Sequence, residues 1–357
     1  MVIRLTQYEF AKIITRKSVY LALAGLLVLL ALYACFGHPG PLNGTAYYKP
    51  YEGAITEEKV QAAQDQKQSE GYSEEKNQNR YGVFYDISIF SPESIKNYAR
   101  YDDSGNVMER TVTVSEIHYN KPWGYLLEYI DQFGVLFMMI IILLGLAPVF
   151  AEEYARGTAA LLRSSKRGRS QVVSAKLMAS MLYVVLCVIL FTGINLLIYW
   201  LRFGNLAGAD TPLQSVGMYF QGFYYEFSPY HLSALQYYGV QLVTHLAGSM
   251  IFGCIVLCVS ALSSTSFVAM VINVAIVGVP YLAFDVLNFN PGWAKWIEEF
   301  SFSTMMRVTR LFQSPASYSV FGMELSYLNL YMIIMGVVTI GVVFGMYRTF
   351  RTREVFS

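Results

Sequence analysis

Long apolar stretches separated by polar segments dominate the chain. A membrane-spanning helix needs about 20 consecutive, mostly apolar residues, because unpaired backbone groups are costly in hydrocarbon. This criterion predicts six spans, at 18–36, 132–151, 177–200, 240–262, 267–288 and 326–346. The pattern therefore predicts an all-α polytopic membrane protein with six transmembrane helices.

Composition excludes a water-soluble globule. Hydrophobic residues make up 55% of the 357 residues, and charged residues make up only 14%. A soluble domain averages about 45–50% apolar and about 25% charged residues. The net charge of +1 gives no reason to expect nucleic acid as a partner.

Basic residues are concentrated on one side of the predicted spans. The segments 1–17, 152–176, 263–266 and 347–357 hold 13 Lys and Arg residues and 4 acids in 57 residues. The segments on the other side hold 13 Lys and Arg residues and 20 acids in 171 residues. Because short cytoplasmic loops are enriched in basic residues, both termini are predicted in the cytoplasm. We expect a multi-pass protein of a bacterial cell membrane.

The first apolar stretch has an alternative interpretation. It ends in Tyr33-Ala34-Cys35 after a basic start, an order that resembles a lipoprotein signal cleaved before the cysteine. Tyr33 is bulky for that position, so a retained helix is favoured.

The two terminal segments are expected in the cytoplasm. Residues 1–17 mix apolar and basic side chains and predict an interfacial (elbow) helix, although a simple basic flank of the first span has the same composition. Residues 347–357 are expected to form a cytoplasmic tail.

Three longer segments are expected on the outer side. Residues 37–131 predict a small mixed α/β extracytoplasmic domain, with a polar helix at 56–69 and a strand at 110–115. The loop 201–239 is rich in tyrosine, which suits a position on the lipid head groups. The loop 289–325 is expected to form short helices that re-enter the outer leaflet.

Catalytic motifs are not found in the sequence. It contains no P-loop, no H-E-x-x-H, no C-x-x-C and no G-x-S-x-G, and its four histidines are scattered. The cysteines lie in apolar stretches without a second type of ligand, so no metal site is expected. The chain is not expected to be an enzyme or to bind a cofactor itself. A further hypothesis is an intramembrane enzyme that depends on His245 or Asp285.

Polar residues inside predicted spans are costly and are often functional. His245 and Asp285 lie near outer ends, where an interhelical hydrogen bond or contact with head groups is the ordinary explanation. Pro280 is expected to kink the fifth span and to free a backbone carbonyl. The candidate residues of a transport pathway are Asn195, His245, Asn273, Pro280 and Asp285.

The most informative segment is the predicted cytoplasmic loop 152–176. Glu152 and Glu153 end one span, Gly157 allows a break, and a short helix with two exposed leucines would follow. An apolar and basic projection joined to two spans is a suitable surface for a motor subunit to push, whereas a solvated basic loop would not need the leucines. The candidate coupling residues are Glu152, Glu153, Arg156, Gly157, Thr158, Leu161, Leu162, Arg163, Ser164, Ser165 and Arg169.

This segment resembles the permease subunits of type-2 ATP-binding cassette (ABC) exporters. Those subunits typically contain Glu-x-x-x-Gly-Thr, then Leu-Leu, a turn of small and basic residues, and a Lys at the start of the third span. Matching residues occur here in the same order, at Glu153, Gly157, Thr158, Leu161, Leu162, Ser164, Ser165, Arg169 and Lys176. The amphipathic start with Glu9 and Lys12 also fits, whereas the long region after the first span departs from compact members.

The resemblance implies that 157–165 is a coupling helix that docks into a separate cytoplasmic ATPase subunit, which would bind ATP and Mg. It also implies two permease chains in the lipid bilayer, either copies or paralogues. The implied function is export, or extraction from the membrane, of a hydrophobic or amphipathic peptide, drug or lipid-like molecule. An alternative is an ABC-like sensor module that detects an extracellular ligand through 37–131 and signals without net transport.

Overall fold

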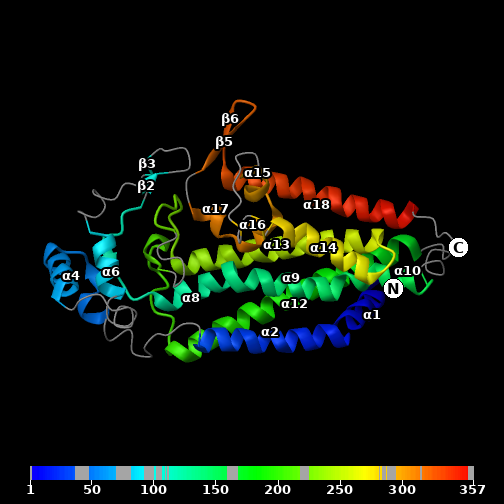
Figure 1. The fold of residues 1–357 in the computed structure, drawn as a ribbon, viewed down its shortest axis with the longest axis horizontal. Helices are drawn as coiled ribbons and strands as arrows, with labels where there is room; N and C mark the ends of the chain where they lie inside the picture. The colour runs from blue at the N-terminus through cyan, green and yellow to red at the C-terminus, as the bar shows by residue number, and fades with distance from the viewer. Residues whose placement is uncertain are drawn as a thin grey trace.

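The computed structural model describes residues 2–36, 48–69, 82–91, 100–101, 107–108, 110, 112–158, 168–217, 225–280, 282–283, 287, 295–313 and 316–352. Long helices lie side by side in an elongated bundle (Figure 1). One end carries α1 (Val2–Ile14) and the end of α18 (Tyr327–Thr352), and the other carries the small helices α4 (Glu57–Ser69) and α6 (Gly82–Ile89). We call these the inner and outer ends, following the orientation that the charge distribution predicts.

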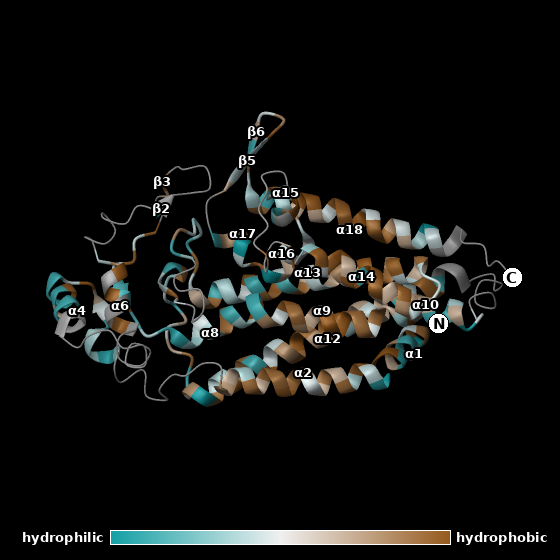
Figure 2. Ribbon diagram, viewed as in Figure 1, coloured by the Kyte–Doolittle hydropathy of each residue, from teal (hydrophilic) through white to brown (hydrophobic). Residues whose placement is uncertain are grey.

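Five helical stretches are long and apolar enough to cross a membrane, so the chain is a mostly helical, multi-pass membrane protein. They are Lys17–Phe36, Lys121–Ala155, Gln171–Phe203, Ala234–Leu262 and Tyr327–Thr349. The first is α2 (Lys17–Phe36), and the last three lie in α12 (Gly168–Phe203), α13 (Ala234–Leu262) and α18. The stretch predicted at 267–288 coincides with the shorter apolar helix α14 (Ser266–Pro280), so the described residues give five candidate spans, not six. Apolar residues are concentrated along the middle of the bundle (Figure 2).

The second candidate span is a composite helix. In it α8 (Lys121–Tyr129), the π-helical turn η2 (Ile130–Gly134), α9 (Val135–Leu146) and α10 (Pro148–Ala155) follow one another. The helix therefore begins earlier than the apolar stretch at 132–151 suggests. α8 contains charged residues, which end an apolar stretch, but it is buried because it packs against α12 and α13.

The region between the first two spans contains helices and short strands. Beside α4 and α6 it holds η1 (Lys49–Tyr51), β1 (Gly53–Ala54), β2 (Arg100–Tyr101), β3 (Val107–Met108) and β4 (Glu116–Ile117). β1 pairs with β4 and β2 with β3, both antiparallel. The prediction of a strand at 110–115 is wrong for the described residues 110 and 112–115, which are not in a strand. The residues that pair with β1 are those of β4, directly after this segment. A separate small core consists of Tyr48, Ala63, Val83, Ile87, Ile117 and Tyr119.

Buried polar contacts fasten this outer domain to the bundle. Asp86 of α6 accepts a hydrogen bond from the Tyr48 hydroxyl, and its carboxylate lies 3.3 Å from Lys121 Nζ. Burial raises the pKa of Asp86, although the Lys121 charge and these hydrogen bonds oppose the shift. Because Lys121 begins the composite helix, the outer domain contacts the helix that runs to the inner end.

Most of the described aromatic residues of the loop 201–239 are buried inside the protein, namely Tyr225, Phe227, Tyr237 and Tyr238. Tyr225 and Tyr237 are fully buried, with their hydroxyl oxygens 2.8 Å apart, and the Tyr237 ring packs against Phe312. The expected position on the head groups is therefore wrong for these residues, because they find partners in the bundle.

Short helices and a hairpin precede the last span. They are α15 (Lys295–Glu299), α16 (Phe302–Arg307), α17 (Thr309–Gln313), β5 (Ser317–Val320) and β6 (Met323–Ser326), and the loop before α13 contains η3 (Leu213–Ser215). α16 packs mainly against α13 and also contacts η2 and α9. Short helices are present in this segment, as predicted, and their re-entry into the outer leaflet stays a prediction.

Candidate functional site

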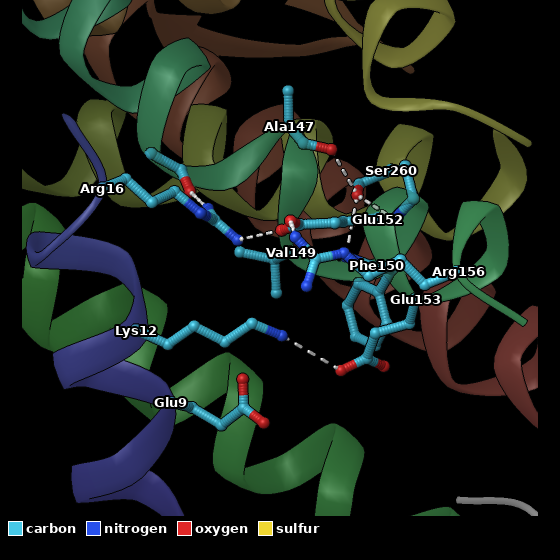
Figure 3. A network of polar contacts seen from close by, with 12 residues as sticks. Glu9, Lys12, Arg16, Ala147, Val149, Phe150, Glu152, Glu153, Arg156 and Ser260 are labelled. Carbon is cyan, nitrogen blue, oxygen red and sulfur yellow. Dashed lines mark hydrogen bonds and ion pairs between the residues drawn. The ribbon is translucent and has the colours of Figure 1, made fainter. Parts of the chain in front are cut away.

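A break in the second span lies near the inner end. Pro148 lacks the amide hydrogen of the helix ladder and separates α9 from α10. Ser260 of α13 fills the break, because its Oγ donates to the Ala147 carbonyl (2.7 Å) and accepts from the amides of Phe150 (3.0 Å) and Ala151 (3.1 Å) (Figure 3). In an unbroken helix the Ala147 carbonyl would accept from the Ala151 amide. Ser260 therefore stands between two groups of the ladder and satisfies both.

Arg16, between α1 and α2, binds both halves of the broken span. Its Nη1 donates to the Gly145 carbonyl at 2.7 Å, and its Nη2 donates to Glu152 Oε2 at 3.0 Å (Figure 3). Glu152 Oε1 also accepts from Arg156 Nη2 at 2.5 Å, one turn further along α10. The start of the first span is thereby tied to the end of the second.

Lys176 of α12 is the most deeply buried charge of this region, with an exposed fraction of 0%. Its Nζ lies 2.9 Å from Glu9 Oε2, 2.7 Å from Glu153 Oε1 and 3.1 Å from the Val149 carbonyl. These three acceptors match the three N–H groups of an ammonium. The Phe150 ring lies 5.6 Å from Nζ, close enough for a favourable cation–π contact. Lys176 therefore connects α1, α10 and α12.

A fourth cation borders the same acids, because Lys12 Nζ lies 3.6 Å from Glu153 Oε1 (Figure 3). Removing one partner from a buried ion pair leaves an uncompensated charge and costs about 3–5 kcal/mol. Opposite charges at these distances therefore hold the inner ends of α1, α10 and α12 together. We call this set the inner ionic cluster; it consists of Glu9, Lys12, Arg16, Glu152, Glu153, Arg156 and Lys176.

The candidate coupling residues fall into three groups. Glu152, Glu153 and Arg156 belong to the inner ionic cluster. Gly157 follows α10 with a φ of +69°, which glycine adopts without strain, and Thr158 Oγ1 donates to the Glu153 carbonyl at 3.3 Å. Arg169 lies in the first turn of α12. The others lie outside the described residues: Leu161, Leu162, Arg163, Ser164 and Ser165.

The described candidate pathway residues lie on three different helices, α12, α13 and α14. Asn195 is buried on α12, and Asn273 of α14 donates to the carbonyl of Ala269 in its own helix at 2.8 Å. His245 of α13 has its Nδ1 2.5 Å from the Met306 carbonyl of α16, so it links a span to a short outer helix.

The two candidates at the end of the fifth predicted span have different outcomes. Pro280 is the last residue of α14, and residues 282 and 283 beyond it are again helical, of the π type, so the kink at Pro280 stays a prediction. Asp285 lies outside the described residues.

Sequence reasoning missed Ser260 and Arg16, and it found Lys176 and Glu9 only as parts of a motif. A lysine in an apolar stretch and an acid in an amphipathic segment are a signal for an ion pair, because each needs a counter-charge. Ser260 offers no such signal. A serine in a helix can also bond to its own backbone, as Ser263 does with the Val259 carbonyl.

Comparison with known proteins identifies the family. The sequence model described as ABC-2 family transporter protein matches residues 3–354. No curated protein matches the chain, and no solved structure does. Members of this family are membrane components that work with an ABC ATPase. The match covers nearly the whole chain, which therefore belongs to the ABC-2 type transporter permease family.

Proposed function

We propose that this permease works in an exporter in which a separate ATPase subunit drives release, or extraction from the membrane, of a hydrophobic or amphipathic molecule. A peptide, a drug or a lipid-like molecule is the expected cargo. The inner ionic cluster is the observation that carries the proposal, because it joins α10 and α12, the helices before and after the loop that is expected to meet the ATPase.

The closure is direct. Glu153 lies just before the loop and Lys176 lies on the helix that follows it, and their charged atoms are 2.7 Å apart. A force on the loop is therefore applied to α10 and α12 together. Glu9 passes it to α1 through the same ammonium, 2.9 Å away. Mechanical coupling of this kind needs a rigid connection, and a buried ammonium with three acceptors within 3.1 Å supplies one.

The remaining partners follow from the same proposal. The ATPase would bind ATP and Mg, and Leu161 and Leu162 would enter its surface. A second permease, either a copy or a paralogue, would complete the transporter. α2 and α18 are the least buried of the candidate spans, so they offer surface to lipid or to that second permease.

Co-purification tests the proposal. The tagged permease is extracted in mild detergent, and the proteins bound to it are identified for the native chain and for Leu161→Asp/Leu162→Asp. Burying two leucines at a contact is worth roughly 3 kcal/mol or more, which is over about 100-fold in affinity. We therefore expect an ABC ATPase with the native chain and its loss from the double variant.

The control is Val107→Asp, which adds a charge at an exposed position of the outer domain. It should keep the ATPase. If the ATPase is missing from the native preparation, or stays bound to the double variant, the coupling role of the loop is wrong.

A second candidate is the sensor module that responds to an extracellular ligand. It is favoured by the contact between Asp86 and Lys121, which joins the outer domain to the helix that ends in the inner ionic cluster. Liposomes that contain the permease and its ATPase distinguish the two. An exporter moves a fluorescent amphipathic compound only with ATP, whereas a sensor changes ATPase rate with outer ligand and moves nothing.

A further inference from the structure

The β5–β6 hairpin ends in an unusual turn. Val320 pairs with Met323, and the two residues between them, Phe321 and Gly322, both have positive φ, +52° and +81°. Two-residue turns of this kind favour Asn-Gly or Asp-Gly, because a bulky side chain is strained in the left-handed region. A phenylalanine at this position is held against its backbone preference. Strained residues of this kind often have a function.

Burial of the Phe321 side chain within the chain does not offset this backbone strain. Its exposed fraction is 99%, and that of Met323 beside it is 61%. Two further apolar residues of α15 are half exposed, Trp296 at 55% and Ile297 at 50%. An exposed large apolar side chain at the tip of a hairpin indicates a contact surface.

The base of the hairpin is rigid. The Tyr318 hydroxyl donates to Glu299 Oε2 at 2.6 Å, and the Tyr327 hydroxyl donates to the Glu299 carbonyl at 2.6 Å. The Tyr327 amide donates to the Ala316 carbonyl at 2.9 Å, and the Phe300 ring packs against both tyrosines. The tip is therefore presented in a fixed direction.

That direction leads away from the bundle on the side of α18, across the axes of the long helices (Figure 1). The hairpin joins α18 directly at Tyr327, so its base lies where this span begins. α18 itself exposes apolar side chains to its surroundings, including Ile333 and Val337. The exposed tip thus extends the exposed apolar surface of α18 sideways, at the end where this span begins.

We propose that the β5–β6 hairpin is a membrane anchor, which inserts Phe321 and Met323 between the head groups and acyl chains of the outer leaflet. Interfacial aromatic residues favour this depth. Among residues 316–326 the sole charged residue is Glu324, and none is basic. The anchor therefore needs no anionic lipid and binds a zwitterionic surface. The proposal depends on membrane embedding alone and not on the ATPase or cargo.

Quenching by lipids tests the anchor in the full-length chain. The four native cysteines are replaced, Met323→Cys carries an environment-sensitive fluorophore, and the protein is placed in phosphatidylcholine nanodiscs with or without a lipid bearing a doxyl group near the head group. We expect strong quenching at position 323. A label at Val107→Cys, exposed on the outer domain, should show little.

Substitutions at the tip separate insertion from simple proximity. Phe321→Leu should keep the quenching at position 323, whereas Phe321→Asp should lower the inserted-to-free ratio of the tip about tenfold or more. The proposal is overturned if quenching at 323 equals that at Val107, or if Phe321→Asp leaves it unchanged. Efficient disulfide formation between two Phe321→Cys chains without lipid quenching would also overturn it, because the occupant would then be a second copy.

Discussion

Replacing Lys176 by methionine tests the inner ionic cluster directly. Methionine keeps the unbranched shape of the side chain and removes its charge. Glu9 and Glu153 are 7% and 6% exposed, so water cannot compensate them once the ammonium is gone. Removing one partner of a buried ion pair costs about 3–5 kcal/mol. We expect the free energy of unfolding of Lys176→Met, measured by denaturant titration in mixed micelles, to fall by about this amount.

Lys12→Met is the matched control. It removes the same group from the same acid, but Lys12 Nζ lies 3.6 Å from Glu153 and its side chain is 30% exposed. A partly exposed pair contributes up to about 1 kcal/mol. Adding Glu153→Gln to Lys176→Met should recover part of the loss, because it neutralises an acid whose remaining partner, Lys12, is more distant and partly exposed. Equal losses from the two lysine variants, or a Lys176→Met loss below about 1 kcal/mol, would refute the central role of Lys176.

Three further outcomes follow from individual contacts. Ser260→Ala should lower the free energy of unfolding by about 1–3 kcal/mol in the same titration, because it leaves buried amides and a carbonyl unsatisfied, whereas Ser249→Ala on the same helix should change it little. Gly145→Ala should also destabilise the bundle, by about 1–3 kcal/mol, since its Cβ would lie 2.5 Å from the Tyr183 ring. Burial raises the pKa of Asp86, so the folded outer domain binds a proton more tightly than the unfolded chain. The contribution of Asp86 to the stability of the outer domain is therefore fully present below the ordinary pKa of 3.8 and is lost as pH rises through the raised pKa. Hydrogen-exchange protection of α6 should show this pH dependence in the native chain and not in Asp86→Asn.

The spans were predictable where lipid contact sets the composition. α2 and α18 are mostly exposed to the surroundings of the bundle, and their apolar stretches were recognised close to their observed bounds. α8 was not recognised, because its burial comes from packing against α12 and α13, which permits charged residues such as Glu128. The same reason explains the error for Tyr225 and Tyr237, whose hydroxyls pair with each other and do not face head groups.

The acids of the candidate site were predictable, but its geometry was not. Glu152 and Glu153 are conspicuous at the end of an apolar stretch, and the order of residues after them carries the family resemblance. The partners come from distant parts of the chain: Arg16 lies 136 positions from Glu152, and Lys176 lies 167 positions from Glu9. Local patterns contain no information on such pairs, because the pairing depends on how the helices cross.

Under the proposed coupling, the composite helix connects the outer domain to the inner ionic cluster. Lys121 meets the outer domain at one end, and Glu152 and Glu153 meet α1 and α12 at the other. Between these ends α9 is buried among other helices, and an irregular turn bounds it on each side, η2 toward the outer end and the break at Pro148 toward the inner end. Since Ser260 and the inner ionic cluster fix the angle at the inner break, α10 moves together with α1 and α12 and not independently of them. Under the proposed coupling, a displacement imposed on the loop after α10 would therefore move these three helices together with the inner end of α9, which Arg16 and Ser260 hold to α10. The inner ionic cluster would then determine how much of the motor's work reaches the bundle.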